Sequence, residues 1–188
     1  MPVNATSLSN RLLVAVPALR QGSFERSVTL LCQHDGDGAM GVMVNRASEY
    51  TVGDVLDQMG IDCADERLRA DVVLSGGPVH PERGFVIHDG EQVFDSTLQV
   101  GDGLHLTTSR DVLEAMAAGE GPQQRLVALG CAGWGEGQIE QELREDSWLL
   151  VPSDPRLLFE VPLEQRWQAA AGSIGVDLVS MAHHSGHA

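Results

Sequence analysis

The residues with the most chemical potential lie in one stretch, Leu129 to Trp148, which is LGCAGWGEGQIEQELREDSW. An apolar run ends there in a glycine-rich bend at Gly130, Gly133, Gly135 and Gly137, and a helical pattern follows. Backbone N–H groups that converge at the start of a helix can hold an anion. The spacing matches neither G-x-G-x-x-G nor G-x-x-x-x-G-K-[ST]. A tight turn with Trp134 packed on the domain is therefore the favoured interpretation.

Cys131 stands at the end of the strand expected before these glycines, where a nucleophile could be presented. A nucleophile elbow needs glycines two positions before and two after the nucleophile, whereas Gly130 is directly adjacent. No spacing nominates a histidine as its base, and catalysis by a thiol needs one. Because free cysteine is readily buried, the sequence favours a structural thiol at Cys131.

Carboxylates crowd the segment from Glu136 to Asp146 and could supply an acid–base pair or bind a hard metal ion. Glu140 and Arg144 are, however, spaced for an i, i+4 ion pair in the favourable orientation. This pattern predicts a helix whose charged face is exposed to solvent. The tail histidines His183, His184 and His187 lack partners at ligand spacing, so we expect no native metal site and no cofactor.

A second glycine-rich turn, LSGGPV at 74–79, ends another apolar run. If the two strand ends lie side by side, their glycine loops form a shared crevice of the kind in which α/β sheets bind ligands. Arg46, which follows a further expected strand, is a candidate anion contact there. The candidate ligand-binding residues are Asn45, Arg46, Ser75, Gly76, Gly77, Pro78, Gly130, Cys131, Gly133, Trp134 and Gly135.

Charge and cysteine content exclude several classes of function. The net charge is −15, and all 12 basic residues are arginine. Without lysine there is neither a phosphate-loop lysine nor a Schiff-base lysine. The acidity opposes direct binding of nucleic acid, which depends on neutralising phosphates. Cys32, Cys63 and Cys131 form no C-x-x-C pair, which favours reduced thiols and a cytoplasmic location. No apolar run approaches the ~18 residues of a membrane span, so we expect no membrane partner.

Short apolar runs between turn signals predict strands, and most are apolar throughout, which predicts burial on both faces. HDGDG at 34–38 predicts a hairpin. Thr51 and Ser109 are expected helix caps, and further helices are expected around Ile139 and Leu143 and around Trp167. The sequence thus predicts an α/β (α+β mixed) domain over 1–180 with a flexible tail at 181–188. The expected strands contain 12–16, 28–32, 42–44, 72–74, 85–87, 104–106, 126–129 and 149–151.

Together, five segments resemble the YqgE/AlgH family of bacterial proteins. They are GAMGVMVNR (38–46), LSGGPV (74–79), LGCAGWGEGQIEQEL (129–143), SWL (147–149) and the terminal GHA (186–188). The resemblance implies a mixed, partly barrel-like, bifurcated sheet surrounded by helices. It also implies an association with regulation of alginate synthesis, and no settled enzymatic activity. The family usually has an aromatic residue where this chain has Cys131.

The resulting functional hypothesis is a regulatory protein that binds a small ligand or a protein partner, as a monomer or a weak homo-oligomer. Two alternatives stay open. One is a hydrolase or transferase that uses Cys131 or a carboxylate between Glu136 and Asp146. The other is a transcriptional regulator of exopolysaccharide synthesis, which the family name suggests and the charge of −15 opposes.

Overall fold

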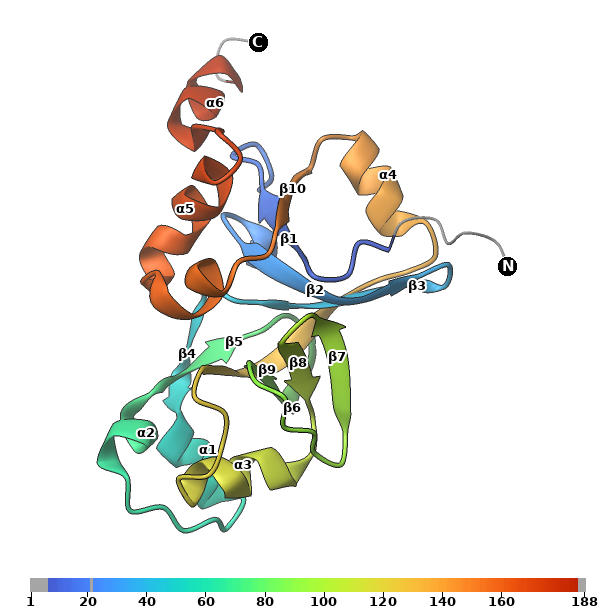
Figure 1. Ribbon diagram of the computed structural model, residues 1–188. Coiled ribbons are helices and arrows are strands. Elements are labelled where there is room, and N and C mark those ends of the chain that lie inside the picture. Colours follow the sequence, from blue (N-terminus) through green and yellow to red (C-terminus); the bar gives the residue numbers. More distant parts are fainter. Residues whose placement is uncertain (1–6, 21, 186–188) are drawn as a thin grey trace.

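The computed structural model describes residues 7–20 and 22–185 (Figure 1). The strands are β1 Arg11–Ala15, β2 Val28–Asp35, β3 Gly38–Met43, β4 Ala47–Thr51, β5 Val72–Ser75, β6 Val79–His88, β7 Thr97–Gly101, β8 Leu104–Thr107, β9 Arg125–Trp134 and β10 Trp148–Pro152. The α-helices are α1 Val52–Gln58, α2 Glu66–Ala70, α3 Arg110–Ala117, α4 Gln138–Arg144, α5 Arg166–Gly172 and α6 Leu178–Ser185. Short helical turns are η1 Gly22–Phe24, η2 Arg156–Glu160 and η3 Leu163–Gln165.

Strand β9 is the branch point of the sheet. The main path runs β10-β1-β2-β3-β9-β6-β8-β7, while β5 also pairs with β9 and carries β4. The last residues of β9 pair with β3, and its first residues pair with β6. The β5–β9 pairing is parallel and the other pairings are antiparallel. The predicted mixed, bifurcated sheet with surrounding helices is confirmed, and the sheet does not close.

The helices cover the sheet in separate groups, as Figure 1 shows. Helices α5 and α6 lie on one side of β1 and β10, and α4 lies on the other. Helices α1, α2 and α3 gather at the far end of the molecule, beside the half that contains β4 to β8. Apolar residues fill the spaces between these layers, since one buried cluster joins the two halves and two others lie under the helix groups.

The predicted burial of strands on both faces is confirmed in β1. Leu12 and Val14 belong to the cluster between the two halves. Leu13 and Ala15, which point to the opposite face because side chains alternate along a strand, belong to the cluster under α4. A continuously apolar sequence therefore marks a strand of this sheet that is covered on both faces, as β1 is.

Local signals in the sequence set several boundaries. Asp35 pairs with Gly38 in the predicted β2–β3 hairpin. Thr51 caps α1 in a reciprocal capping box with Asp54, as expected. Ser109 does occupy the N-cap position of α3, but the prediction that its side chain caps the helix is wrong. Its hydroxyl instead donates to the carboxylate of Asp111, at 2.5 Å.

A buried polar chain crosses the half of the sheet that contains β6, β7 and β8. The backbone N–H of Phe94 donates to Thr97 Oγ1, which lies 2.9 Å from Thr107 Oγ1. Thr107 Oγ1 in turn lies 2.7 Å from Nε2 of the buried His88. Nδ1 of His88 lies 3.1 Å from the carbonyl oxygen of Asp89, which can only accept, so Nδ1 carries the proton and Nε2 accepts from Thr107. His88 is therefore a core residue, fully buried and held at both ring nitrogens.

The C-terminal end is helical further than the sequence predicts. Helix α6 extends to Ser185, so the predicted tail boundary at 181 falls inside a helix. Residues 186–188 of the expected tail, and the GHA segment with His187, lie outside the described residues.

Candidate functional site

The two glycine-rich segments lie against each other, which was the condition for the shared crevice. The backbone N–H of Gly76 donates to the carbonyl of Leu129, at 2.8 Å, and its carbonyl accepts from Met43 N–H, also at 2.8 Å. A Cβ atom on Gly76 would overlap the carbonyl oxygen of Gly130, and one on Gly77 would overlap that of Cys131. These glycines therefore allow direct contact between two stretches of backbone, and no space for a ligand lies between them.

The second segment is mostly strand and not a bend. Residues from Gly130 to Trp134 belong to β9, and only Gly135 to Gly137 form the turn before α4. The N–H of Gly135 is already satisfied by Oε1 of Gln138, at 2.9 Å. Anion binding by converging N–H groups of a long glycine loop thus has no structural basis at Gly130 and Gly133.

Trp134 packs on the domain. Its indole is buried and contacts the rings of Phe24 and Trp148. The indole N–H groups of Trp134 and Trp148 both donate to Oε1 of Glu142, at 3.2 and 2.9 Å. This carboxylate therefore anchors α4 onto two buried aromatic side chains, which is a structural role.

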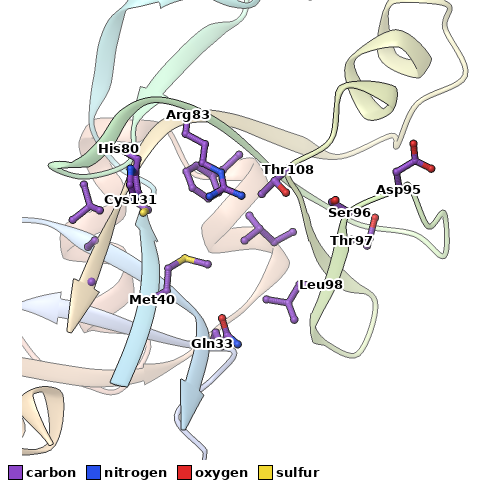
Figure 2. A pocket seen from close by; sticks show the side chains of 15 residues that line it. Gln33, Met40, His80, Arg83, Asp95, Ser96, Thr97, Leu98, Thr108 and Cys131 are labelled. Atoms are coloured by element: carbon purple, nitrogen blue, oxygen red, sulfur yellow. The ribbon is translucent and has the colours of Figure 1, made fainter. Parts of the chain in front are cut away.

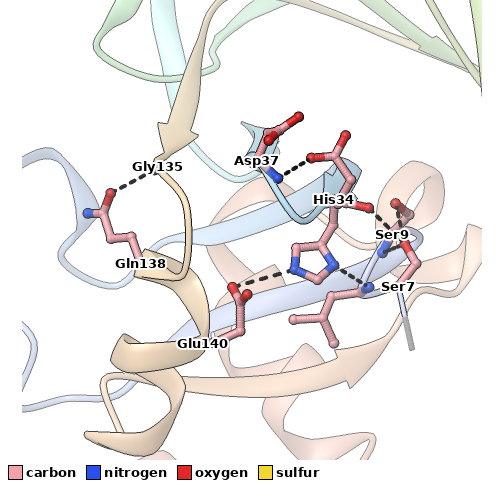
Figure 3. A network of polar contacts seen from close by, with 9 residues as sticks. Ser7, Ser9, His34, Asp37, Gly135, Gln138 and Glu140 are labelled. Atoms are coloured by element: carbon pink, nitrogen blue, oxygen red, sulfur yellow. Dashed lines mark hydrogen bonds and ion pairs between the residues drawn. The ribbon is translucent and has the colours of Figure 1, made fainter. Parts of the chain in front are cut away.

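The predicted solvated face of α4 is present at Gln141, Arg144 and Glu145, which are exposed, but Glu140 departs from it (Figure 3). Glu140 Oε1 lies 3.5 Å from Nε2 of His34, whose Nδ1 accepts from the backbone N–H of Leu8 at 3.0 Å. The predicted Glu140–Arg144 pair is wrong, because Arg144 donates to Oε1 of Gln141 instead. The carboxylates of α4 that contact neighbouring elements thus serve packing between α4, β2 and the N-terminal segment.

A cavity opens beside the glycine contact, between the two halves of the sheet. Its volume is about 580 Å³, and six strands contribute to its walls. Side chains from these strands point into a common space (Figure 2). The mouth of a partly closed β-structure is a common place for a ligand site. The lining residues are Gln33, Met40, Val79, His80, Arg83, Phe85, Asp95, Ser96, Thr97, Leu98, Leu106, Thr108, Cys131, Ala132 and Gly133.

The cavity combines apolar walls with a cationic group. Met40, Phe85 and Leu98 line it, and the guanidinium carbon of Arg83 lies 5.6 Å from the centre of the Phe85 ring. Among the described residues, Arg83 has no carboxylate within ion-pair distance. In Figure 2, Asp95 lies at the opposite end of the cavity from His80 and Cys131. The arrangement suits a small molecule that has an apolar body and an anionic group.

Cys131 forms part of the cavity wall, but its environment does not activate the thiol. Burial raises the pKa of Cys131, and the nearby charge of Arg83 lowers it by less. A thiol with a raised pKa carries little thiolate near neutral pH, and the thiolate is the nucleophile. The thiol of Cys32 is fully buried nearby, and burial raises its pKa to about 12. These environments fit the structural role predicted for Cys131.

The predicted site residues separate into groups in the structure. Cys131 and Gly133 line the cavity, whereas Ser75, Gly76, Gly77 and Gly130 belong to the backbone contact or lie next to it. The other predicted residues, which are Asn45, Arg46, Pro78, Trp134 and Gly135, are absent from the cavity lining. Their ligand-binding role stays a prediction that nothing in the geometry of this cavity supports.

Asn45 and Arg46 have structural contacts of their own. The amide of Asn45 bridges the backbone, accepting from Val28 N–H at 2.8 Å and donating to the carbonyl of Arg26 at 2.9 Å. The guanidinium of Arg46 donates to the carbonyl of Glu25, at 2.7 Å. The cationic side chain at the cavity is Arg83, in the segment VHPERG that follows LSGGP. Sequence reasoning missed Arg83, although it lies within a few residues of a turn that was singled out.

A family model matches the part of the chain that contains these strands, the glycine contact and the AGW segment of β9. The model described as AlgH-like matches residues 12–179. The chain belongs to the AlgH-like family. This assignment confirms the resemblance that the glycine-rich segments indicated.

Relatives and solved structures agree with the AlgH-like assignment. UPF0301 proteins of Xanthomonas campestris pv. campestris (strain B100) and Xanthomonas axonopodis pv. citri (strain 306) are each 66% identical over 188 residues, which is 100% of both chains. The solution structure of the AlgH protein from Pseudomonas aeruginosa has a TM-score of 0.80 and 40% identity, covering 96% of each chain. A protein from Corynebacterium diphtheriae shares the fold alone, with a TM-score of 0.75 and 21% identity over 97% of this chain and 94% of that one.

Two further properties of the described part of this AlgH-like chain bear on function. No helix within it is long and apolar enough to cross a membrane. Within the same residues, no three His, Cys, Asp or Glu side chains are grouped so as to hold a metal ion. No catalytic function is established for the family.

Proposed function

We propose that this AlgH-like protein is a regulatory protein that binds a small molecule in the cavity between the two halves of its sheet. The observation that carries the proposal is the position of Arg83. Its guanidinium lines a cavity of about 580 Å³ with no carboxylate partner among the described residues, beside the apolar walls at Met40 and Phe85. A charge-assisted hydrogen bond from Arg83 would hold an anionic group, and the walls would cover the apolar part of the ligand.

The proposed location is the cytoplasm, which is supported by the three free cysteines of the described chain. The enzymatic alternative through Cys131 has less support, because burial raises the pKa of that thiol. We propose a monomer or weak homo-oligomer as the working form. The regulatory part of the proposal follows the family, and the ligand-binding part follows the cavity.

The binding proposal is testable with matched small probes. Hexanoate and phenylacetate carry the expected anionic group and apolar body, while hexanamide and phenylacetamide lack the charge. We expect the two carboxylates to shift the backbone amide signals of Arg83, Leu98 and Cys131 in ¹H–¹⁵N NMR spectra. We expect the two amides to bind about tenfold more weakly or not at all, because a hydrogen bond to a charged group contributes about 1.5–3 kcal/mol.

Substitution separates the role of Arg83 from that of net charge. Arg83→Gln removes the cation from the cavity, and Arg156→Gln removes one from an exposed turn that does not line it. We expect the first variant to lose about tenfold in carboxylate affinity and the second to bind like the unmodified protein. Carboxylates that shift amides elsewhere but leave the cavity unaffected, or that bind Arg83→Gln with undiminished affinity, would refute the proposed site.

A further inference from the structure

A second and larger hollow lies on the other side of β6 from the ligand cavity. It is a groove of about 1130 Å³ between α1, α3 and the adjoining strands. We call it the α1–α3 groove. The lining residues are Glu49, Tyr50, Asp54, Val55, Asp57, Gln58, Met59, Pro81, Glu82, Gly84, Phe85, Val86, Thr107, Thr108, Ser109, Arg110, Val112, Leu113, Val127 and Leu129.

Apolar side chains from α1, α3, β6 and β9 line the groove. Val55 and Met59 come from α1 and the turn that ends it, Leu113 from α3 and Leu129 from β9. Val55, Met59 and Leu129 are only partly buried, so they offer apolar surface to a partner. Tyr50 adds an aromatic ring, since it is 51% exposed and is among the large hydrophobic side chains most exposed to solvent. An aromatic residue beside a partly buried apolar surface is the composition of a protein interface.

The charged residues of the groove are mostly of one sign. Glu49, Asp54, Asp57 and Glu82 line it, against a single basic residue, Arg110. Arg110 is occupied within the protein, because it donates to the carbonyl of Met59 at 2.7 Å and pairs with Glu114 at 3.4 Å. Four acidic residues around an apolar surface repel anions and attract cations.

The acids of the groove differ in how far they are already neutralised. Asp57 pairs with Arg69 at 2.8 Å, and Asp54 accepts from the backbone of Thr51 in the cap of α1. Glu49 and Glu82 are exposed, and within the described chain neither has an ion-pair partner. These two carboxylates are therefore the ones free to pair with a partner's cations.

We propose that the α1–α3 groove docks a segment of a partner protein in which lysine or arginine residues flank apolar side chains. The apolar side chains would cover Met59 and Leu129, and the cations would pair with Glu49 and Glu82 at the edges. A cation near Tyr50 gains a further attraction from the face of the ring. The combination of an apolar floor with unpaired carboxylates favours this partner over a small anion or an anionic membrane surface, which the same charges repel.

Peptide probes test the chemistry of the partner. The probe is a dye-labelled synthetic peptide of lysine, leucine and serine, with two control peptides in which glutamate replaces lysine or serine replaces leucine. We expect the first peptide to bind in fluorescence anisotropy titrations and both controls to bind at least about tenfold more weakly, since charge and apolar contact contribute together. Equal binding of the peptide without leucine would overturn the proposal, because attraction to the net charge of −15 would then suffice.

Matched variants test the location of binding. Glu49→Gln combined with Glu82→Gln removes two exposed charges from the groove, whereas Glu136→Gln combined with Glu160→Gln removes two exposed charges that do not line it. We expect about tenfold weaker binding for the groove variant, and binding by the control variant that matches the unmodified protein. Tyr50→Ser is expected to weaken binding about threefold. Equal losses in the two double variants would overturn the assignment to the groove.

The groove could alternatively be covered by a second copy of the chain. We expect the amide signals of Val55, Met59 and Leu113 to shift on addition of the lysine–leucine peptide and to stay fixed when the protein alone is concentrated. Shifts of these signals with protein concentration alone would overturn the proposal in favour of self-association. Carboxylate binding at Arg83 is measured separately, so failure at the groove leaves the ligand-cavity proposal intact.

Discussion

Replacing Gly76 by alanine should damage the contact that joins β5 to β9. The added methyl group would overlap the carbonyl oxygen of Gly130 and lie 3.0 Å from Cγ1 of Val42. The carbonyl oxygen of Gly130 belongs to the backbone of the central strand β9, so it cannot rotate away as a side chain could. The backbone of Gly76 also makes hydrogen bonds to Leu129 and Met43, each 2.8 Å long, which any displacement would lengthen.

The cost follows from these two effects. Overpacking of a well-packed core costs about 1–3 kcal/mol, and weakening two backbone hydrogen bonds costs about 1 kcal/mol each. The smaller entropy of the unfolded alanine variant offsets about 0.4–1 kcal/mol. We therefore expect Gly76→Ala to lower the free energy of unfolding by about 3 kcal/mol. For a chain of this size, that corresponds to a fall in Tm of about 10 °C.

Strand β9, which Gly76 contacts, supplies a control. Gly133 has no atom within 4 Å of the position that a Cβ would take, and its φ lies outside the left-handed region. We expect Gly133→Ala to change the free energy of unfolding by less than about 0.5 kcal/mol. Both variants are compared with the unmodified protein by urea unfolding followed by circular dichroism. A Gly76→Ala protein as stable as Gly133→Ala would show that the glycine contact is not as tight as the structure has it.

Two further predictions concern buried titratable groups. Burial lowers the pKa of His88 below its usual 6.5, so the unfolded chain binds a proton more readily. The stability that His88 contributes should be fully present above pH 6.5 and lost as the pH falls below it, by at most about 1.4 kcal/mol per pH unit for one group. Urea unfolding at several pH values should show that the free energy of unfolding falls less steeply with pH in His88→Gln. The same pH dependence in both proteins would contradict this. Cys63 is partly exposed whereas Cys32 and Cys131 are buried with raised pKa values, so iodoacetamide near neutral pH should label Cys63 first by mass spectrometry; rapid labelling of Cys131 would restore the enzymatic alternative.

Much of the fold could be predicted because its strands carry strong local signals. The eight predicted strands are all present, since short apolar runs that are bounded by turn signals, such as LLVA in β1, favour buried strands. Strands β4 and β7 were missed, because ASEYT and TLQVG are largely exposed and carry no apolar run. Helix α2 was also missed, since a five-residue helix with one buried side chain, Leu68, shows no helical period.

The site was predicted less well, for a physical reason. Glycine in a sequence signals either a turn that presents N–H groups or a close approach of two chains, and one sequence cannot distinguish these. At Gly76 and Gly130 the second applies, so the space for a ligand lies beside the contact and not within it. The pairing of β6 with β9 is what brings Arg83 to this space, and pairings between distant strands leave no local signal.

Residues His80 to Arg83 lie opposite the single residue Gly130, because Val79 pairs with Cys131 and Gly84 with Leu129. This bulged run of backbone is a partition: His80 and Arg83 face the ligand cavity, while Pro81 and Glu82 face the α1–α3 groove. A partition displaced toward one compartment must recede from the other. If a ligand in one compartment displaces this run, thermodynamic linkage requires each occupant to change the affinity of the other by the same factor.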